Sequence, residues 1–226
     1  MTQDASLPAS ILFSEEEVPF ELSLDIARKD VFRNGITKIP IVKKSNGEHV
    51  HIDLTPAGDY MRTPFGAAEF QASGKGGPVR KKQTRPVYTP DMNLVLEIND
   101  PALVSLLSNL SSEITDLVLK SAIQLGLSGN YDEIAKQNNL YKPPVNSIFR
   151  SFKSTLRLKC SSSGLLRPNV VCVNRQGEPK PGSISDIVEN SMVRPTALLA
   201  GVWVNGKGEW GVSIHATNII MAPPLE

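Results

Sequence analysis

The clearest hydrophobic pattern lies at the C-terminal end of the chain, where two apolar, β-branched runs flank a short polar segment. The runs are Thr196–Val204 and Trp210–Ile220, and Asn205-Gly206-Lys207-Gly208 lies between them. Asn-Gly supplies the positive φ angles of a tight turn, so the pattern predicts a β-hairpin. Both alternating sets of side chains in the first run are apolar. This predicts a ribbon buried on two sides, as in a small closed barrel.

Gly201 interrupts the first run, and a glycine inside a strand predicts a bulge or a bend at a barrel corner. The apolar surroundings of Trp203 favour burial of its ring. Strict alternation predicts one face made of Ala197, Leu199, Gly201 and Trp203, and an opposite face made of Leu198, Ala200, Val202 and Val204.

Shorter alternating runs predict further strands upstream of this hairpin. Residues 38–44 and 48–54 read as a second hairpin around Ser45-Asn46-Gly47. His49 and His51 share one face there, and a solvent-facing pair is favoured over a metal site because no acidic cluster adjoins them. Further strands are predicted at 93–98, 154–159 and 170–174. In the strand 154–159, leucines alternate with Arg157 and Lys159, so one face enters the core and the other presents cations.

The hydrophobic period changes after Asp100-Pro101, from two residues to three and four. Leucine, isoleucine and valine recur at this spacing from Leu103 to Ile123, with Asp100 as the N-cap and Pro101 at the first helical position. The spacing predicts an amphipathic helix that ends near Gly126 or Gly129, and a short helix at 131–138 follows. The resulting fold class is mainly β with a helical insertion (α+β). Its domain covers residues 28–226, with the insert at about 100–140.

Residues 1–27 carry six acidic and no basic residues, which predicts an acidic, loosely ordered tail; a helix over 14–27 is the alternative. The net charge of the chain is only +1, but its distribution is uneven. Residues 28–90 carry twelve basic and five acidic residues, and 141–182 carry eight and one, with an acidic stretch between them. Two basic blocks in one domain suggest a single positive face, against the alternative of independent solvated loops.

The two cysteines, Cys160 and Cys172, have no metal-ligand spacing and indicate a reduced, intracellular protein. The sequence has no signal-peptide pattern and no apolar run of the length that a membrane span needs, so we expect a soluble protein without a membrane partner. No nucleophile elbow, P-loop or metal-binding acidic cluster is present, so we expect neither an enzyme nor a cofactor.

Nucleic-acid binding fits the residues better than catalysis. A glycine-rich basic loop and cations beside aromatic rings would suit a polyanion whose bases stack on any ring, although each ring could also pack in the core and the loop could simply be disordered surface. The candidate residues are Arg62 with Phe65, the loop residues Lys75, Arg80, Lys81, Lys82 and Arg85, then Tyr88, Tyr141, Lys142, Phe149, Arg150 and Lys153.

Four short motifs, taken in order, resemble those of single-stranded-DNA-binding proteins of large DNA viruses and bacteriophages. They are Thr63-Pro-Phe-Gly66, Tyr141-Lys-Pro-Pro-Val145, Ser154–Lys159, and the final pair Leu199–Val204 with Gly206–Ser213. The resemblance covers about residues 36–224. It implies an OB-fold-like five-stranded barrel that coats single strands during viral or phage DNA replication and recombination, with proteins of those processes as further partners.

The family motif positions fall on Phe65, Arg157, Lys159, Trp203 and Trp210. Ile214 and His215 replace the tryptophan and lysine of the last motif, which removes the expected stacking and phosphate contacts there. The alternative function is a virion structural or assembly protein, in which the barrel is a scaffold and the basic segments contact packaged nucleic acid. The oligomeric state and the preference between DNA and RNA stay open.

Overall fold

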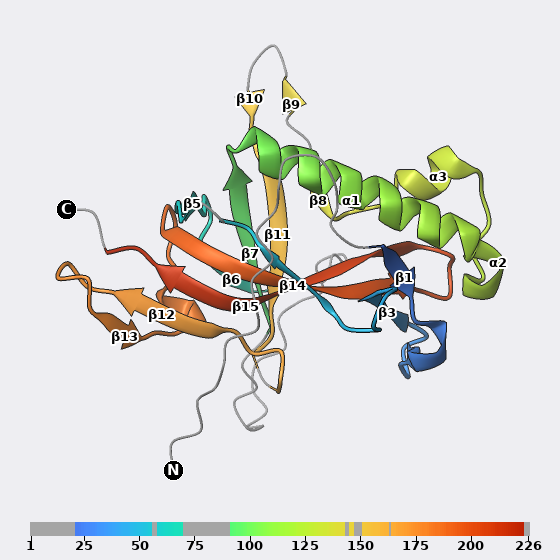
Figure 1. Ribbon diagram of the computed structural model, residues 1–226, viewed down its shortest axis with the longest axis horizontal. Helices are drawn as coiled ribbons and strands as arrows, with labels where there is room; N and C mark the ends of the chain where they lie inside the picture. The colour runs from blue at the N-terminus through green and yellow to red at the C-terminus, as the bar shows by residue number, and fades with distance from the viewer. Residues whose placement is uncertain are drawn as a thin grey trace, which may run out of the picture.

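The predicted C-terminal hairpin forms the centre of the fold (Figure 1). Its strands are β14 (Met192–Val204) and β15 (Trp210–Met221), which pair antiparallel along almost their whole length. The computed structural model describes residues 21–55, 58–69, 91–142, 145–146, 151–162 and 164–223. Over these residues the chain is mainly β-sheet with a helical insertion, as predicted.

Most other strands flank this hairpin in one large sheet, whose main path has the order β1-β3-β14-β15-β11-β7-β6, while β9 and β10 form a separate two-stranded sheet. No ladder among the described residues joins β6 back to β14, so the closed five-stranded barrel stays a prediction. The strands before β14 are β1 (Leu22–Leu24), β2 (Asp30–Val31), β3 (Thr37–Lys43), β4 (Val50–Asp53), β5 (Met61–Arg62), β6 (Ala67–Glu69), β7 (Met92–Ile98), β8 (Tyr141–Lys142), β9 (Val145–Asn146), β10 (Ser151–Phe152), β11 (Ser154–Cys160), β12 (Asn169–Val173) and β13 (Pro179–Pro181).

The bulge predicted at Gly201 is present and changes which side chains enter the core. The β14–β15 register shifts between Leu199 and Gly201, where Gly201 has a φ of 152°. A Cβ atom at this position would lie 2.2 Å from the carbonyl oxygen of Ile39, so the close approach of β3 requires glycine. The extra residue reverses the alternation, and the two predicted faces are therefore wrong beyond the bulge. The core residues of β14 are Val193, Ala197 and Leu199 before it, and Val202 and Val204 after it.

The predicted hairpin over 38–54 is much shorter than expected. Its turn is closed by two hydrogen bonds, from Lys43 N to Glu48 O and from Gly47 N to Lys43 O, both 2.8 Å long. Beyond the bridge between Val42 and His49, however, β3 and β4 do not pair with each other. Instead, β3 pairs with the far end of β14 and β4 with its middle, because β14 is long enough to accept both in succession.

The predicted helix is α1 (Pro101–Lys120), and α2 (Ala122–Leu125) and α3 (Tyr131–Ala135) follow it. The Asp100 side chain accepts a hydrogen bond from Ala102 N at 2.9 Å, as expected of an N-cap. Gly126, in the left-handed region at φ 68°, ends α2. By length and composition α1 could also cross a membrane, but its apolar stripe packs into the protein core. Its buried apolar residues are Leu103, Leu107, Leu110, Ile114 and Val118.

The helical insert is joined to the hairpin by hydrogen bonds that cover one edge of β15. Trp210 N donates to Gln137 Oε1 at 2.9 Å, and Val212 N donates to Asn139 Oδ1 at 2.6 Å. The indole Nε1 of Trp210 donates to the carbonyl oxygen of Ile134 at 3.1 Å. Side chains from the insert therefore satisfy backbone groups that a neighbouring strand would otherwise occupy.

The folded part of the chain begins before the predicted boundary at residue 28. Strand β1 pairs with β3, and the short helix η1 (Ile26–Arg28) follows it. Leu22 is only 4% exposed and belongs to the core, and its amide donates to Glu113 Oε1 on α1 at 3.0 Å. The tail prediction is therefore wrong from residue 21 onward, as is the alternative helix in its described part; residues 1–20 lie outside the described residues.

Candidate nucleic-acid interface

Strand β11 presents cations on the side that faces away from the core, as its sequence predicted. Its even-numbered positions from Ser154 to Cys160 are buried, whereas Arg157 is exposed and Lys159 is half-buried. The side of the sheet that carries Arg157 and Lys159 is called the outer face below.

The strand registers extend this outer face across the sheet. Lys159 lies opposite His215 on β15 and opposite Asn93 on β7. His215 in turn lies opposite Leu198 on β14, which lies opposite His51 on β4. Because residues directly opposite each other in paired strands share a face, these five residues form one row across the outer face.

A second row brings the first basic block onto the same face. Lys38 on β3 lies opposite Trp203 on β14, which lies opposite Gly211 on β15. Burial lowers the pKa of Lys38, and the positive charge of Lys159 lowers it further. Lys38 and Lys159 are 121 residues apart in sequence, so one cation from each basic block lies on this face.

His215 occupies the centre of this region but carries no positive charge near neutral pH. Its side chain is only 4% exposed, and its Nδ1 lies 3.4 Å from the Ser161 hydroxyl. Burial lowers its pKa to about 4, with smaller contributions from Lys159 and Lys38 that Asp91 partly offsets. A neutral, covered imidazole offers a phosphate no charge.

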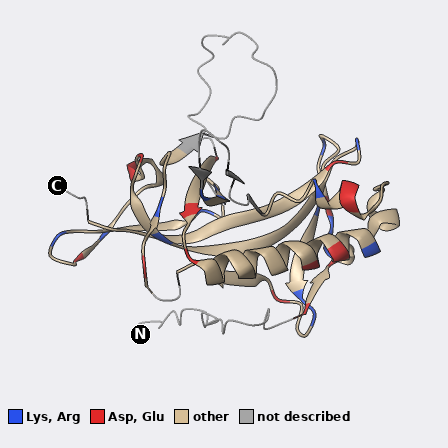
Figure 2. Ribbon diagram, turned by 90° about the horizontal axis from the view of Figure 1, so that it is seen from above, with Lys and Arg blue, Asp and Glu red and all other residues tan. Residues whose placement is uncertain are grey.

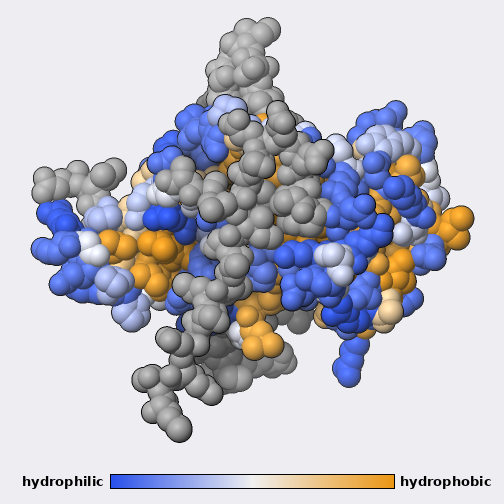
Figure 3. Space-filling view, viewed as in Figure 1, coloured by the Kyte–Doolittle hydropathy of each residue, from blue (hydrophilic) through white to orange (hydrophobic). Residues whose placement is uncertain are grey.

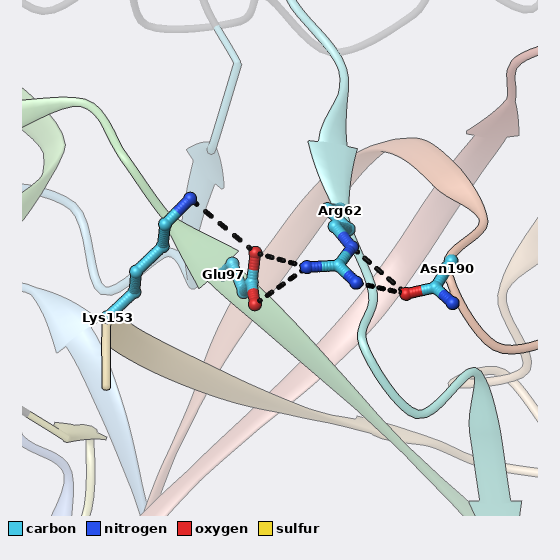
Figure 4. A network of polar contacts seen from close by, with 4 residues as sticks. All are labelled: Arg62, Glu97, Lys153 and Asn190. Atoms are coloured by element: carbon cyan, nitrogen blue, oxygen red, sulfur yellow. Dashed lines mark hydrogen bonds and ion pairs between the residues drawn. The ribbon is translucent and has the colours of Figure 1, made fainter. Parts of the chain in front are cut away.

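A second group of charges lies between β5, β7 and the start of β11 (Figure 4). Glu97 accepts ion pairs from Arg62 Nη1 at 3.4 Å and from Lys153 Nζ at 3.9 Å. Arg62 also donates from Nε to Asn190 Oδ1 at 3.0 Å, and from Nη2 to the same oxygen. We call these four residues the Glu97 cluster. Here too a cation of the first basic block meets one of the second, with a shared carboxylate between them.

Phe65 is exposed on a turn that is firmly held by the backbone. Its ring is 69% exposed, between β5 and β6. Thr63 N donates to Ser191 O at 2.9 Å, and Asn190 N donates to Thr63 O at 2.8 Å, so the turn is fastened to the segment before β14. An exposed ring on a fixed backbone is suited to stacking on a base, because little conformational freedom is lost on contact.

The two tryptophans have different environments. Trp203 is half-buried on the outer face, so the burial favoured by its apolar strand is incomplete. Trp210 is 2% exposed in the core, and its Nε1 is already bonded to Ile134 O. The motif position at Trp210 therefore has a structural role, because no base can reach the ring in this fold.

Several predicted residues are not placed by the structure. The backbones of Tyr141 and Lys142 pair with β11, but their side chains lie outside the described part. The remaining candidates that fall entirely outside the described residues are Lys75, Arg80, Lys81, Lys82, Arg85, Tyr88, Phe149 and Arg150.

Sequence reasoning missed two residues of the outer face. Lys38 begins a predicted strand, but its neighbours across the sheet could not be inferred from the alternating pattern. Phe32 lies outside every motif, and the structure places its ring centroid 4.8 Å from Lys38 Nζ. In the sequence, the only indication for Phe32 and Lys38 was their spacing of six residues within a basic stretch. Many surface loops have a cation and an aromatic residue at such a spacing.

Charge and apolar surface are unevenly distributed over the molecule. Seen from above, α1 lies along one side of the sheet, and its first three turns carry no charged residue (Figure 2). In the space-filling view, hydrophilic surface surrounds apolar patches over β12 and the end of β15, and near α2 (Figure 3).

Across the described ranges no three histidine, cysteine, aspartate or glutamate residues are grouped for a metal ion. Both cysteines are free thiols, and burial raises the pKa of Cys160 to about 12.

No family model and no curated protein matches the chain. Among solved structures, it matches the single-stranded DNA-binding protein from bacteriophage Enc34 in complex with single-stranded DNA, with a TM-score of 0.45 and 10% identity over 93% of this chain and 98% of that chain. It also matches gp2.5, a single-stranded DNA-binding protein encoded by bacteriophage T7, with a TM-score of 0.40 and 13% identity over 74% and 84% of the two chains. Both belong to the group that the four motifs resemble. At these values the likeness is one of strand and helix arrangement and transfers neither a site nor an activity.

Proposed function

We propose that this protein binds single-stranded DNA without sequence preference, on the outer face of an OB-type barrel. The observation that carries the proposal is that cations of both basic blocks lie on one face of the sheet. From the first block come Lys38 and Arg62, and from the second Lys153, Arg157 and Lys159. Trp203 lies half-buried on the same face, and Phe65 supplies an exposed ring on the turn between β5 and β6.

The chemistry of this face suits an unpaired strand. Lysine and arginine side chains along a face can neutralise successive phosphates, and each such contact releases counterions. Exposed rings can stack on any base, which contributes about 1–3 kcal/mol per base and does not depend on sequence. In a duplex the bases are stacked on each other and paired, so these rings would contribute nothing there.

The biological setting that we propose is the coating of single strands during viral or phage DNA replication and recombination inside a host cell. The basic loop around Lys75–Arg85 would add electrostatic contacts at the side of the bound strand. Tyr88, Tyr141, Lys142, Phe149 and Arg150 belong to the same proposal.

A salt-titrated competition between single-stranded DNA, duplex DNA and RNA of equal length tests this function. We expect single-stranded DNA to bind most tightly and its affinity to fall steeply as salt rises. Lys159→Gln should weaken binding several-fold and reduce the salt slope by about one. Lys120→Gln, at the exposed end of α1, removes the same charge away from the outer face and should change little.

Equal binding of duplex and single strand, together with ordered self-assembly of the protein alone, would instead support a virion structural or assembly role. Weak single-strand binding that does not respond to salt would refute nucleic-acid binding by this face altogether.

A further inference from the structure

We propose that Phe32, Lys38 and Trp203 form a nucleotide subsite at the β2–β3 end of the outer face, where a base stacks on an aromatic ring and its phosphate contacts the Lys38 ammonium. The subsite rests on the proposed function, since its ligand is one nucleotide of a bound single strand. It extends the surface proposed to contact DNA from β11, β15 and β14 to β2 and β3, which contain none of the four sequence motifs.

Phe32 is a large apolar ring that the fold leaves at the surface. It follows β2, and its backbone forms a tight turn in which Phe32 N donates to Ile36 O at 2.8 Å and Gly35 N donates to Phe32 O at 3.0 Å. The ring is 43% exposed, and its neighbour Val31 is 70% exposed. The turn therefore holds the ring in place without covering it, which leaves ring surface open to a base.

Lys38 connects this ring to the outer face. Its Nζ lies 4.8 Å from the centroid of Phe32, within the range of a cation–π contact. In the sheet, Lys38 lies opposite Asp30 on β2 and opposite Trp203 on β14. Lys38 thus has two aromatic neighbours, Phe32 by direct contact and Trp203 by strand register. A cation next to a stacked base can neutralise the phosphate of the same nucleotide.

The indole of Trp203 lies over Gly211, a residue that has no side chain to displace it. A Cβ atom at Gly211 would lie 2.7 Å from Cζ2 of Trp203 and 2.8 Å from its Cε2. The indole therefore occupies the space above the Gly211 backbone. Asn139 Oδ1 lies equally close to this space, 2.8 Å from the same Cβ position, and accepts from Val212 N. Gly211 is thus a positioning residue, because any side chain there would push the indole off the sheet.

The charges around Lys38 have both signs. Lys159 lowers the pKa of Lys38, whereas Asp91 and Asp30 each raise it by a smaller amount. A phosphate would interact favourably with the ammonium group that Lys38 presents beside the Phe32 ring. The exposed ring supplies the other half of nucleotide recognition.

The decisive experiment measures oligo-dT binding to the full chain by fluorescence anisotropy, for wild type and two matched pairs of variants. Phe32→Ala is paired with Tyr131→Ala, because Tyr131 on α3 is 44% exposed and lies off the outer face. Lys38→Gln is paired with Lys120→Gln. We expect Phe32→Ala to weaken binding by about five- to a hundredfold, the range of one base stack, and Lys38→Gln by several-fold, while both controls bind as wild type.

Two further readouts use the folded wild-type chain, and only the first needs a variant, the conservative Trp203→Phe. The chain has two tryptophans and Trp210 is buried, so quenching of intrinsic fluorescence by oligo-dT should come from Trp203 and disappear in Trp203→Phe. Photocrosslinking with an iodouracil-substituted oligonucleotide should label the peptide that contains Phe32.

The inference is overturned if wild type binds with salt dependence while Phe32→Ala and Lys38→Gln match their controls and the Phe32 peptide is not labelled. In that case the proposed function stands and the strand follows another path. If wild type does not bind oligo-dT at all, the proposed function fails first and the subsite fails with it.

Discussion

The outer face has two charged regions that are built in opposite ways. In the Glu97 cluster, Arg62 and Lys153 come from different basic blocks and both form ion pairs with one carboxylate. In the region around His215, Lys159 lies close enough to Lys38 to lower the pKa of Lys38, and the histidine between the strands is buried and neutral. The cations of the first region share one carboxylate, whereas the second region brings two lysines near each other with Asp91 nearby.

This difference matters for what a polyanion gains at each region. A phosphate that approaches the Glu97 cluster must compete with an internal carboxylate for the same two cations. Exposed ion pairs of this kind stabilise the fold by only about 0–1 kcal/mol, so the competition weakens a phosphate contact without preventing it. Near His215 a phosphate would offset the unfavourable effect of Lys159 on Lys38. We therefore expect the strand to gain most of its electrostatic affinity away from Glu97.

The largest expected effect tests whether His215 is neutral in the fold. Its folded pKa of about 4 lies below the ordinary value of 6.5, so the unfolded chain binds the proton more readily. The contribution of the neutral His215 imidazole to folding stability is complete above about pH 6.5 and is lost as pH falls toward 4. The free energy of unfolding should drop over this window by up to about 3 kcal/mol, at about 1.4 kcal/mol per pH unit.

Chemical denaturation of wild type and His215→Gln at pH 7 and pH 4.5 measures this. The variant should lose much of the pH dependence, whereas His49→Gln, at an exposed position, should keep it. An unchanged slope in His215→Gln would mean that His215 titrates normally, and the contrast between the two regions would disappear.

The next effect compares two arginines on the same face. Arg157 is exposed and has no hydrogen-bond or ion-pair partner among the described residues, whereas Arg62 is bonded to Glu97 and Asn190. At low salt, Arg157→Gln should weaken oligo-dT binding by roughly three- to tenfold and reduce the salt slope by about one. Arg62→Gln should cost less than about twofold. Equal losses in the two variants would show that Glu97 does not restrain Arg62.

A smaller effect of opposite sign is expected when the carboxylate itself is removed. Glu97→Gln frees Arg62 and Lys153 for phosphates, so single-strand affinity should rise by about two- to fivefold at low salt. Glu178→Gln makes the same change in net charge at an exposed position on the β12–β13 turn, and should raise affinity far less. A gain of the same size in both variants would point to net charge alone.

The smallest expected effect is in thiol labelling, which tests whether a reagent can reach the buried side of β11 near His215. Cys160 lies beside Lys159 on the core side of β11, and burial followed by the charge of Asp91 raises its pKa to about 12. Cys172 on β12 is only partly buried. In the native protein a thiol-specific reagent at pH 8 should modify Cys172 and leave Cys160 intact, and denaturant should expose both. Rapid native labelling of Cys160, detected by peptide mass analysis, would contradict a closed region.

Local patterns in the sequence were sufficient for the elements whose stability depends on near neighbours. The β14–β15 hairpin followed from its Asn-Gly turn and two long apolar runs, and α1 followed from its leucine spacing, Asp100 and Pro101. The cationic face of β11 followed from strict alternation. In each of these the relevant contacts are made within a few residues or across one turn.

Tertiary structure alone decided how these elements combine. A strand pattern specifies an edge that can accept partners but not which strands occupy it, so pairing of β3 and β4 in succession along β14 could not be predicted. The bulge at Gly201 was expected, but its consequence for the faces depends on the close approach of β3. The inclusion of β1 depends on Leu22 reaching a core built by residues far away in sequence.

The same division holds for the candidate site. Composition and spacing determined that the chain carries two basic blocks with aromatic residues nearby, because charge and side-chain type are properties of the sequence itself. Only the folded sheet decided that Arg62 and Lys153 share Glu97, that Lys38 neighbours both Phe32 and Trp203, and that Trp210 is enclosed. Those outcomes depend on distances between residues on different strands, and the register of a sheet is determined by the packing of its whole core.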